Sequence, residues 1–375
     1  MVDGEADPAC VGVDGRVFSQ PVTGIGRYVF EVARELHREL PFTVFKVYSQ
    51  QALALPLPAQ WQVVVEPDRR LRKINSFVWF RWFSPRLLKL DQPDAYWANA
   101  GFVPVLPRQI PVVAMVYDLV YKLFPHTMRR KTAWQYRLFF ERDLRRTDRV
   151  LALSSGTARR VESTLGIAGL RVALPGVREP FEPVPHERIV AAREQHSLYG
   201  PYLLTVATLE PRKNLVGLVK AWRQLKVRDA ALLNLELVLI GGRGWRDARL
   251  RALLEDVANV GVRTLGRIDD ETLAALYAGA AAVVVPSLYE GFGLPALEAR
   301  ACGARLVCSD LPELREAGGP EAIYVPPTPE GLSDGIAAAV SGRRRAREED
   351  LPGWDVPSRV LADALREVAR CRRTI

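Results

Sequence analysis

Short apolar runs alternate with amphipathic stretches along the first half of the chain. The run at 11–17 has the length of a strand. After a glycine-containing loop at 23–26, the stretch at 27–40 has apolar residues at helical spacing. Further runs with the β-branched or aromatic content of strands lie at 42–48, 61–65, 94–98, 111–117 and 149–154. Because helical stretches separate several of these runs, the pattern predicts a parallel sheet with helices on both faces.

The same alternation begins again after residues 174–185, which are rich in proline, lack periodicity and therefore indicate a linker. We predict an α/β fold of two doubly wound, Rossmann-like domains, at 1–180 and 181–355, that face each other across a cleft. The stretch at 356–375 is expected to form a final helix. The strands expected in the second domain lie at 202–208, 235–242, 262–266, 281–287 and 304–309.

The loop after the expected strand 281–287 has the most distinctive chemistry of the chain. Two carboxylates, Glu290 and Glu298, stand on either side of a glycine-containing bend, and a helix is expected to open at Leu294. Glycines such as Gly293 let backbone amides approach a ligand, and free amides at a helix N-terminus favour phosphate. We expect the backbone around Phe292, Gly293 and Leu294 to bind the phosphates of a ligand.

The two carboxylates extend this expectation to a whole ligand. Glu298 is predicted on the first helical turn, where it can accept hydrogen bonds from the hydroxyls of a ribose. Glu290 precedes the turn and is aimed beyond the phosphate. The arrangement suits a nucleoside diphosphate that carries a sugar. The alternative is that both residues are solvated surface acids, and the local pattern leaves that alternative open.

Residues 287–303, SLYEGFGLPALEARACG, closely resemble the E-x7-E motif of the retaining GT-B glycosyltransferases, a large family (family 4, group 1) that includes bacterial mannosyltransferases. The resemblance covers most of the chain, and the stretch at 353–368 is similar to the helix with which this family crosses back to its first domain. The other matching stretches lie at 11–40, 149–167, 174–183, 202–222 and 266–293. The resemblance implies that the first domain binds the acceptor and that the second binds a nucleotide sugar.

Arg212 and Lys213 follow the expected strand 202–208 and are candidate ligands of a diphosphate. In the family, the lysine of this motif contacts the diphosphate, and such a contact strengthens as the leaving group gains charge. Many relatives carry an arginine where this chain has Thr208, and we expect Arg212 to take over that role. Taken alone, an Arg-Lys pair is more often a solvated helix start.

Further candidate residues rest mainly on the resemblance. Relatives often have a histidine that contacts the donor sugar where this chain has Tyr117, and the neighbouring Asp118 is expected to orient the sugar or the acceptor hydroxyl. Four glycines at strand ends are expected to bring the backbone close to the nucleotide, the first two at the phosphates and the last two at the nucleoside: Gly24, Gly26, Gly241 and Gly242.

The net charge of +9 lies entirely within residues 1–175, which indicates an anionic partner for the first domain. The segment 69–90 contains seven Lys and Arg residues, no acids and five aromatic residues. It is typical of an interfacial segment on anionic lipid. Two alternatives stay open, namely a helix that packs its aromatics into the domain and a surface for single-stranded nucleic acid.

The sequence also limits the chemistry that we expect. Its four cysteines form no C-x-x-C pair, so zinc and a disulfide framework are not expected. We read the acids of 268–271 as a helix start and expect neither a metal nor a cofactor. No apolar run reaches the length of a membrane span. We predict a cytoplasmic protein that lies at the inner face of the cytoplasmic membrane through the segment 69–90.

Together these expectations predict a retaining glycosyltransferase that moves a hexose from a GDP-sugar. The hexose is expected to be mannose or a 6-deoxyhexose such as rhamnose. The acceptor is expected to be a polyprenyl-diphosphate-linked glycan of a bacterial surface polysaccharide. The 6-deoxyhexose rests on Tyr117, whose ring would crowd a 6-hydroxyl. A UDP-sugar enzyme of the same fold and a basic nucleic-acid-binding protein are the alternatives, and the oligomeric state is not predicted.

Overall fold

The computed structural model describes residues 7–18, 24–53, 57–107, 109–228, 232–242, 252–253, 261–342 and 351–373. The chain divides into two compact units. Unit 1 holds residues 1–119, 130–176 and 352–375, and unit 2 holds residues 120–129 and 177–351. The predicted boundary at 180 differs by only a few residues. However, the segment 120–129, which we predicted in the first domain, is part of unit 2.

Unit 1 contains a seven-stranded parallel sheet in the order β3-β2-β1-β4-β5-β6-β7. The described strands coincide with the predicted apolar runs, apart from the two-residue β7, which no run indicated. They are β1 (Cys10–Asp14), β2 (Val44–Ser49), β3 (Trp61–Val65), β4 (Ala95–Ala98), β5 (Val112–Val116), β6 (Arg149–Ala152) and β7 (Arg171–Val172).

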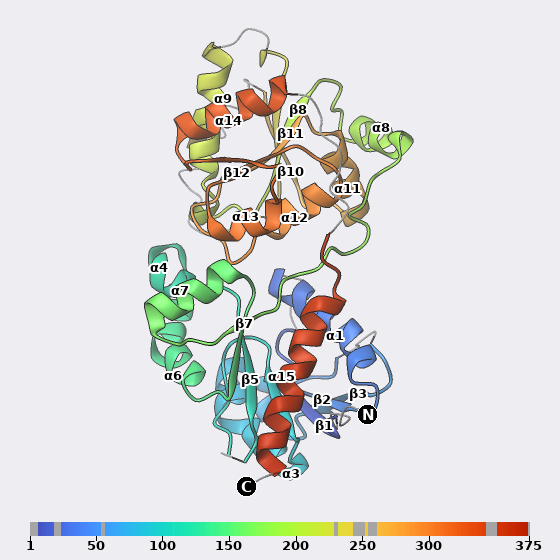
Figure 1. The fold of residues 1–375 in the computed structure, drawn as a ribbon, viewed down its shortest axis with the longest axis vertical. Coiled ribbons are helices and arrows are strands. Elements are labelled where there is room, and N and C mark those ends of the chain that lie inside the picture. Colours follow the sequence, from blue (N-terminus) through green and yellow to red (C-terminus); the bar gives the residue numbers. More distant parts are fainter. Residues whose placement is uncertain are drawn as a thin grey trace. The chain divides into compact units, whose positions relative to one another are not determined.

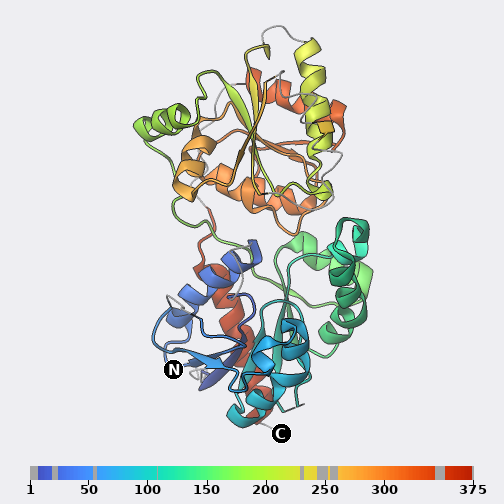
Figure 2. The same ribbon diagram turned by 180° about the vertical axis from the view of Figure 1, so that it is seen from behind.

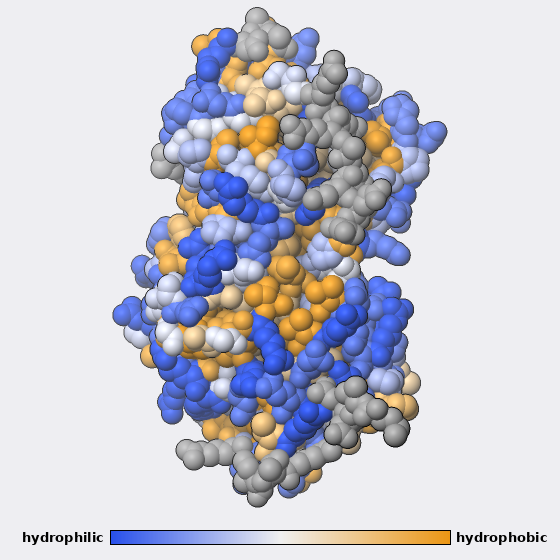
Figure 3. All heavy atoms as spheres, in the orientation of Figure 1, coloured by the Kyte–Doolittle hydropathy of each residue, from blue (hydrophilic) through white to orange (hydrophobic). Residues whose placement is uncertain are grey.

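The helices of unit 1 lie on both faces of this sheet. Helix α15 (Asp355–Arg373) runs in front of the sheet in Figure 1, whereas the helical segment of residues 76–91 is in front when the molecule is seen from behind in Figure 2. The side of α15 that faces the viewer in Figure 3 is mostly hydrophilic. Its opposite side packs on α1 (Gly24–Glu39), where the Ser358 hydroxyl donates to the carbonyl of Val32 at 3.2 Å. The final helix therefore belongs to unit 1 although 175 residues of unit 2 precede it in the chain.

Several shorter helical segments complete unit 1. Residues 76–91 form α2, a π-helical turn η2 and α3, and the Asn75 side chain caps the first of them. The π-helical turn shifts the helical register, so that Trp79 and Phe80 are buried although Trp82 is exposed. The segments are η1 (Leu71–Lys73), α2 (Ser76–Val78), η2 (Trp79–Phe83), α3 (Pro85–Asp91), α5 (Arg130–Gln135), η4 (Tyr136–Phe140), α6 (Glu141–Leu144) and α7 (Ser155–Leu165).

Unit 2 contains a six-stranded parallel sheet in the order β10-β9-β8-β11-β12-β13. Five of its strands coincide with predicted runs, and the three-residue β13 was not predicted. The strands are β8 (Tyr202–Val206), β9 (Glu236–Ile240), β10 (Val262–Gly266), β11 (Ala282–Val285), β12 (Leu306–Ser309) and β13 (Ile323–Val325).

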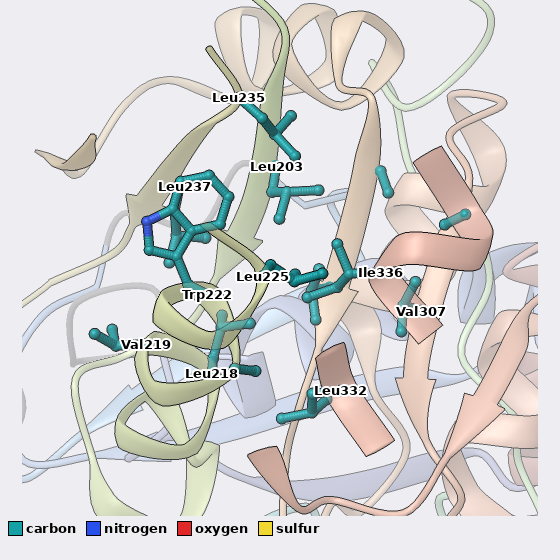
Figure 4. Close-up of a cluster of buried hydrophobic side chains, with 14 of the residues drawn as sticks. Leu203, Leu218, Val219, Trp222, Leu225, Leu235, Leu237, Val307, Leu332 and Ile336 are labelled. Atoms are coloured by element: carbon teal, nitrogen blue, oxygen red, sulfur yellow. The ribbon is translucent and has the colours of Figure 1, made fainter. Parts of the chain in front are cut away.

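One face of this sheet is covered by α9 (Leu215–Arg228) and α14 (Pro329–Ser341). Figure 4 shows the core that results: Trp222 and Leu225 of α9 and Ile336 of α14 point toward the leucines and valines of the central strands. This core holds the carboxyl ends of the strands in fixed positions. The other helical segments of unit 2 are α4 (Val120–Leu123), η3 (Pro125–Thr127), α8 (His186–Gln195), η5 (Pro211–Lys213), α11 (Asp270–Gly279), α12 (Leu294–Ala301) and α13 (Pro312–Gly318).

Candidate functional site

The strand order of unit 2 by itself indicates where a ligand would bind. The sheet runs outward from β8 to β9 and β10 on one side, and from β11 to β12 and β13 on the other, so the winding reverses between β8 and β11. In open parallel sheets, ligands bind beyond the carboxyl ends of the strands at such a point. The loops that leave β8 and β11 are those of Arg212, Lys213 and Glu290.

These two loops are joined at Glu290. Its Oε1 accepts a hydrogen bond from Lys213 Nζ at 2.6 Å and one from the Ser287 hydroxyl at 2.7 Å, and its Oε2 accepts one from Arg212 Nη1 at 3.1 Å. Glu290 is 5% exposed, so these charged groups meet almost out of contact with water. The structure thus brings Glu290 together with the predicted pair Arg212 and Lys213, which stand nearly eighty positions earlier in the chain.

The backbone supports this cluster. Residues Pro211–Lys213 form a 3-10 turn, and the carbonyl of Arg212 accepts a hydrogen bond from the amide of Leu288 at 2.9 Å. The Arg212 guanidinium also donates to the carbonyl of Tyr289 at 2.8 Å and to Glu210 Oε1 at 2.5 Å. Arg212 is therefore fixed by two loops and by two carboxylates.

Sequence reasoning missed three residues of this cluster. Glu210 is a second buried carboxylate beside Arg212, and Ser287 binds Glu290 directly. Asn214 has a left-handed backbone with φ of 53°, and its side-chain amide donates to the carbonyls of Pro286 and Pro327. All three stand within three positions of a predicted site residue. The only available signal was that a polar residue stood next to a predicted motif. That signal does not indicate which side chain or carbonyl each residue contacts.

The environment of Glu290 keeps it ionised. Burial alone would raise the pKa of its carboxyl, but the charges of Lys213 and Arg212, with the hydrogen bonds from Lys213 and Ser287, outweigh burial and lower that pKa from 4.5 to about 2. Because the folded pKa lies below the unfolded one, the stabilisation from this carboxylate is complete above about pH 5. It is lost as the pH falls from about 4.5 to 2.

This shift predicts a specific pH dependence of stability. Between pH 7 and pH 2, the free energy of unfolding of the parent should fall by about 3 kcal/mol more than that of Glu290→Gln, which has no carboxyl to protonate. Urea denaturation of both proteins at pH 7, 5, 3 and 2 measures the difference. Acids away from this cluster titrate equally in both proteins and cancel. Parallel curves over this range would contradict the assigned pKa.

The second predicted carboxylate, Glu298, lies on α12. Gly293 caps this helix with φ of 110°, a conformation that favours glycine, and a Cβ here would lie 2.5 Å from Leu314 Cδ2. Because α12 begins at Leu294, Glu298 occupies its second turn, and the predicted position on the first turn was wrong. Glu298 Oε1 accepts from Arg178 Nη2 at 3.3 Å, and Oε2 accepts from the hydroxyl of Tyr277 at 3.4 Å.

The glycines after β9 allow a close approach of backbone segments. Gly241 has φ of 148°, and a Cβ there would lie 2.0 Å from the carbonyl oxygen of Ala207. A Cβ on Gly242 would meet the Arg267 guanidinium at 2.8 Å. Packing against the backbone thus explains Gly241, whereas the atom nearest to Gly242 belongs to a flexible side chain that can move aside. The rest of the loop, 243–251, lies outside the described residues, so its predicted approach to a nucleoside stays a prediction.

The predicted residues of unit 1 have different surroundings. Tyr117 is buried, its ring packs edge-to-face on Tyr28, and its hydroxyl donates to the carbonyl of Asn99 at 2.7 Å. The Tyr117 side chain is thus held within unit 1 by these contacts. They do not support its predicted contact with a donor sugar. Asp118 follows β5 and is half-buried. Gly24 and Gly26 lie in the first turn of α1, and not in a loop before it as predicted.

The acids of 268–271 form the predicted helix start. Asp269 caps α11: its carboxylate accepts from the amide and from the hydroxyl of Thr272, each at 2.8 Å. Within the described ranges, no three His, Cys, Asp or Glu side chains are grouped so that they could hold a metal ion. The helices in those ranges also include none with the length and apolar character that a membrane crossing requires.

Comparisons with known proteins assign families to both units. Residues 191–350 match the family described as Glycosyl transferases group 1, and residues 22–179 match that described as Glycosyltransferase Family 4. The chain is 40% identical over 144 residues to O-antigen chain mannosyltransferase B of Escherichia coli, an alignment that covers 38% of this chain and 37% of the relative. It is 24% identical over 266 residues to O-antigen chain mannosyltransferase RfbU of Salmonella typhimurium, over 70% of this chain and 69% of the relative.

The fold has close counterparts among solved structures. The structure of Anabaena Alr3699/HepE in complex with UDP and glucose superimposes with a TM-score of 0.64 and covers 98% of each chain at 15% identity. At this identity the likeness concerns the fold. The stronger sequence match, to the Escherichia coli protein, spans little more than a third of that protein, so its whole activity does not transfer with the alignment.

Proposed function

Because the chain belongs to the glycosyltransferases of group 1 and family 4, we propose that it transfers a hexose from a nucleoside diphosphate sugar with retention of the anomeric configuration. The predicted α/β GT-B fold with two doubly wound units is confirmed. The observation that carries the proposal is the Lys213–Glu290–Arg212 cluster at the winding reversal of unit 2. Two cations and a carboxylate meet there, and this supports the binding of a diphosphate next to a reacting sugar.

The cluster supports a division of labour during transfer. Lys213 and Arg212 bind the diphosphate, whose charge grows as the bond from the sugar C1 to the phosphate oxygen breaks. The acceptor hydroxyl oxygen forms the new bond to C1 on the same face, and its proton passes to the departing phosphate oxygen. Glu290 faces the sugar and stabilises the positive charge that develops on it. Glu298 accepts hydrogen bonds from the ribose.

The proposal extends to the identity of the donor, that is, to its sugar and its nucleotide. The names of the relatives favour mannose, and on that ground we propose GDP-mannose as the donor. A 6-deoxyhexose such as rhamnose loses its support because Tyr117 is buried with its hydroxyl on Asn99. The structure with UDP and glucose keeps a UDP-sugar as the second candidate. The proposed acceptor is a lipid-linked glycan, and the relatives' names support a role in O-antigen synthesis.

A donor panel tests the function directly. Purified protein is incubated with GDP-mannose, GDP-rhamnose, UDP-glucose or UDP-galactose and a polyprenyl-diphosphate glycan. The products are identified by mass spectrometry, and their anomeric configuration is determined by NMR spectroscopy. Transfer of mannose from GDP-mannose, with the α-linkage of the donor preserved, is the expected result. Transfer from a UDP-sugar alone would replace the proposed donor, whereas inversion at C1 would overturn the retaining mechanism.

The surface of unit 1 supports a peripheral contact with an anionic membrane. Trp82 is 52% exposed and meets Phe139 edge-to-face at 6.1 Å, and Trp134 and Leu138 beside it are 64% and 54% exposed. We name these four residues the aromatic patch. No acidic residue occurs in 69–90 or in 130–140, the stretches of unit 1 that contain the patch. Exposed apolar side chains in stretches whose charged residues are all basic fit the interface of an anionic bilayer.

The structure narrows the predicted membrane segment. Phe77, Trp79 and Phe80 are buried in unit 1, so the alternative of core packing holds for three of the five aromatic residues of 69–90. Arg81 is also buried, where it pairs with Asp143 at 2.7 Å and 3.0 Å. The exposed cations of the segment, Arg69, Arg70, Arg72, Lys73 and Lys89, remain available to lipid phosphates.

We expect the protein to co-sediment with vesicles of phosphatidylglycerol and phosphatidylcholine at low salt. Replacing Arg69, Arg70, Arg72 and Lys73 with glutamine should release it, because each cation near the surface contributes about 1 kcal/mol, an attraction that salt screens. Trp82→Ser with Trp134→Ser should also weaken binding. Phe42→Ser is the matched control, since Phe42 is 87% exposed in the same unit but outside the aromatic patch. Equal sedimentation of all variants would contradict this surface.

A further inference from the structure

Arg178 stands at the point where the chain enters unit 2, two residues after Gly176. Its guanidinium donates from Nη1 and Nη2 to both carboxylate oxygens of Asp270, at 2.7 Å and 2.9 Å. Nη2 also donates to Glu298 Oε1 at 3.3 Å. The side chain is only 12% exposed, so a residue of the proline-rich linker reaches into the interior beside a predicted ligand-binding carboxylate.

The other oxygen of Glu298 is held from a second direction. Tyr277 of α11 donates its hydroxyl to Oε2 at 3.4 Å. Phe181 lies next to both partners: the Arg178 guanidinium is 4.6 Å from the centre of its ring, and the Tyr277 ring meets it edge-on at 6.0 Å. Arg178, Glu298, Tyr277 and Phe181 thus form a closed ring of contacting side chains.

The chemistry of this ring suits orientation more than stability. A guanidinium presents its donors in a rigid plane, so the two bonds to Asp270 fix the direction of the whole group. The bond to Glu298 then comes from a donor that cannot rotate independently. Replacing a buried ion pair by apolar groups is often neutral for stability, so stability alone does not explain an arginine here. The arginine is explained if it fixes the plane of a Glu298 carboxylate that has to accept hydrogen bonds from two ribose hydroxyls.

We propose that Arg178 is a positioning residue that holds the Glu298 carboxylate in the orientation in which it accepts the ribose hydroxyls of the donor nucleotide. Asp270 acts one step further out, by holding Arg178. The inference rests on the proposed role of Glu298 in the donor site. It assigns a function to a residue that the sequence pattern placed in a linker.

The test measures recognition of the ribose itself. GDP and UDP are titrated into each variant by calorimetry, followed by the 2′,3′-dideoxy form of whichever binds the parent more tightly. A hydrogen bond to a charged group contributes enough for the parent to prefer the ribose form by about tenfold or more. Glu298→Gln should remove most of this preference. Arg178→Gln should reduce it at least threefold and should raise the donor KM while kcat changes less than twofold.

Three further variants separate positioning from folding. Arg178→Lys keeps the charge but loses the planar fork, so its preference for ribose should be intermediate. The double variant Arg178→Gln/Glu298→Gln should discriminate no worse than Glu298→Gln alone, because both changes remove the same contact. Arg188→Gln is the matched control: Arg188 pairs with Glu271 of the same helix as Asp270, but both are exposed. Thermal unfolding of every variant verifies the fold.

The outcomes distinguish the inference from the function on which it rests. If Arg178→Gln keeps the parent's preference for ribose while Glu298→Gln loses it, the positioning role is overturned and the proposed donor site stands. If Glu298→Gln keeps the parent's preference, the assignment of Glu298 to the ribose falls, and the role of Arg178 falls with it. If the double variant discriminates less than Glu298→Gln alone, Arg178 acts on the ribose by another route and the positioning role is again overturned.

Discussion

Replacing Lys213 with alanine is expected to lower kcat/KM by about 30- to 1000-fold, equivalent to about 2–4 kcal/mol of transition-state stabilisation. The lysine ammonium is held 2.6 Å from Glu290 by two loops at the winding reversal of unit 2. It is thus oriented before the donor arrives. A fixed cation interacts most strongly with the diphosphate in the transition state, where negative charge develops on the leaving group. Removing Lys213 should therefore lower kcat more than it raises KM.

Two comparisons make the Lys213 result specific. Lys220→Ala removes an exposed lysine of α9 in the same unit and should leave kcat/KM at the parent value. Lys213→Arg keeps the charge on a broader head group and should restore part of the activity. Initial rates with the best donor of the panel measure all three variants. A Lys213→Ala protein that folds and works at the parent rate would exclude this lysine from the reaction.

The sequence predicted the strands well because each one is a buried apolar run in a parallel sheet. Such runs stay readable without any knowledge of their neighbours. The strands that it missed, β7 and β13, are two and three residues long, too short for any periodicity to appear. Their existence depends on pairing with β6 and β12, which is tertiary information.

Helix starts were harder to predict because glycine has two uses. At Gly24 we expected a loop and the structure begins α1 there, whereas at Gly293 we expected a loop and the structure has a left-handed cap. Helix α12 nevertheless begins at Leu294 as predicted, and Glu298, its fifth residue, lies on the second turn. The basic and aromatic segment 69–90 was ambiguous for a related reason, since a π-helical turn interrupts the spacing that would have marked its buried face.

The candidate site was predictable in its parts but not in its pairing. Lys213, Arg212 and Glu290 were each predicted to meet a ligand, and none was predicted to meet another. Their contact follows from the adjacency of β8 and β11, which local pattern does not give. The same holds for Arg178, because its partners Asp270 and Glu298 are about a hundred positions away. Because the loops after β8 and β11 are in contact, a donor that binds Lys213 and Arg212 has to displace Glu290 from them.

In the described structure, the two cations of the cluster are already neutralised by carboxylates. Glu290 pairs with Lys213 and Arg212, and Glu210 pairs with Arg212. A diphosphate that enters must therefore compete with Glu290 for both cations and come to lie near its negative charge. If Glu290 also stabilises the reacting sugar, its effects on binding and on turnover have opposite signs.

We therefore expect Glu290→Gln to separate binding from turnover. Glutamine keeps the shape and can still bond Ser287, but the change removes the negative charge that Lys213 and Arg212 share, while Arg212 keeps its pairing with Glu210. The affinity for the free nucleoside diphosphate should rise roughly fivefold, about 1 kcal/mol for one like charge removed at a partly screened site. Turnover should fall about 100-fold, because the positive charge on the sugar in the transition state loses its carboxylate.

Calorimetry with GDP and UDP and steady-state rates with the matching donor measure the two effects on the same protein. Glu271→Gln, an exposed acid of α11, controls for the loss of one charge from unit 2. Glu210→Gln removes a carboxylate partner of Arg212 and leaves the pairs of Glu290 in place, so it should strengthen nucleotide binding while costing much less turnover than Glu290→Gln. A Glu290→Gln protein that binds nucleotide more weakly and turns over at the parent rate would show that this carboxylate serves only to hold the two loops together.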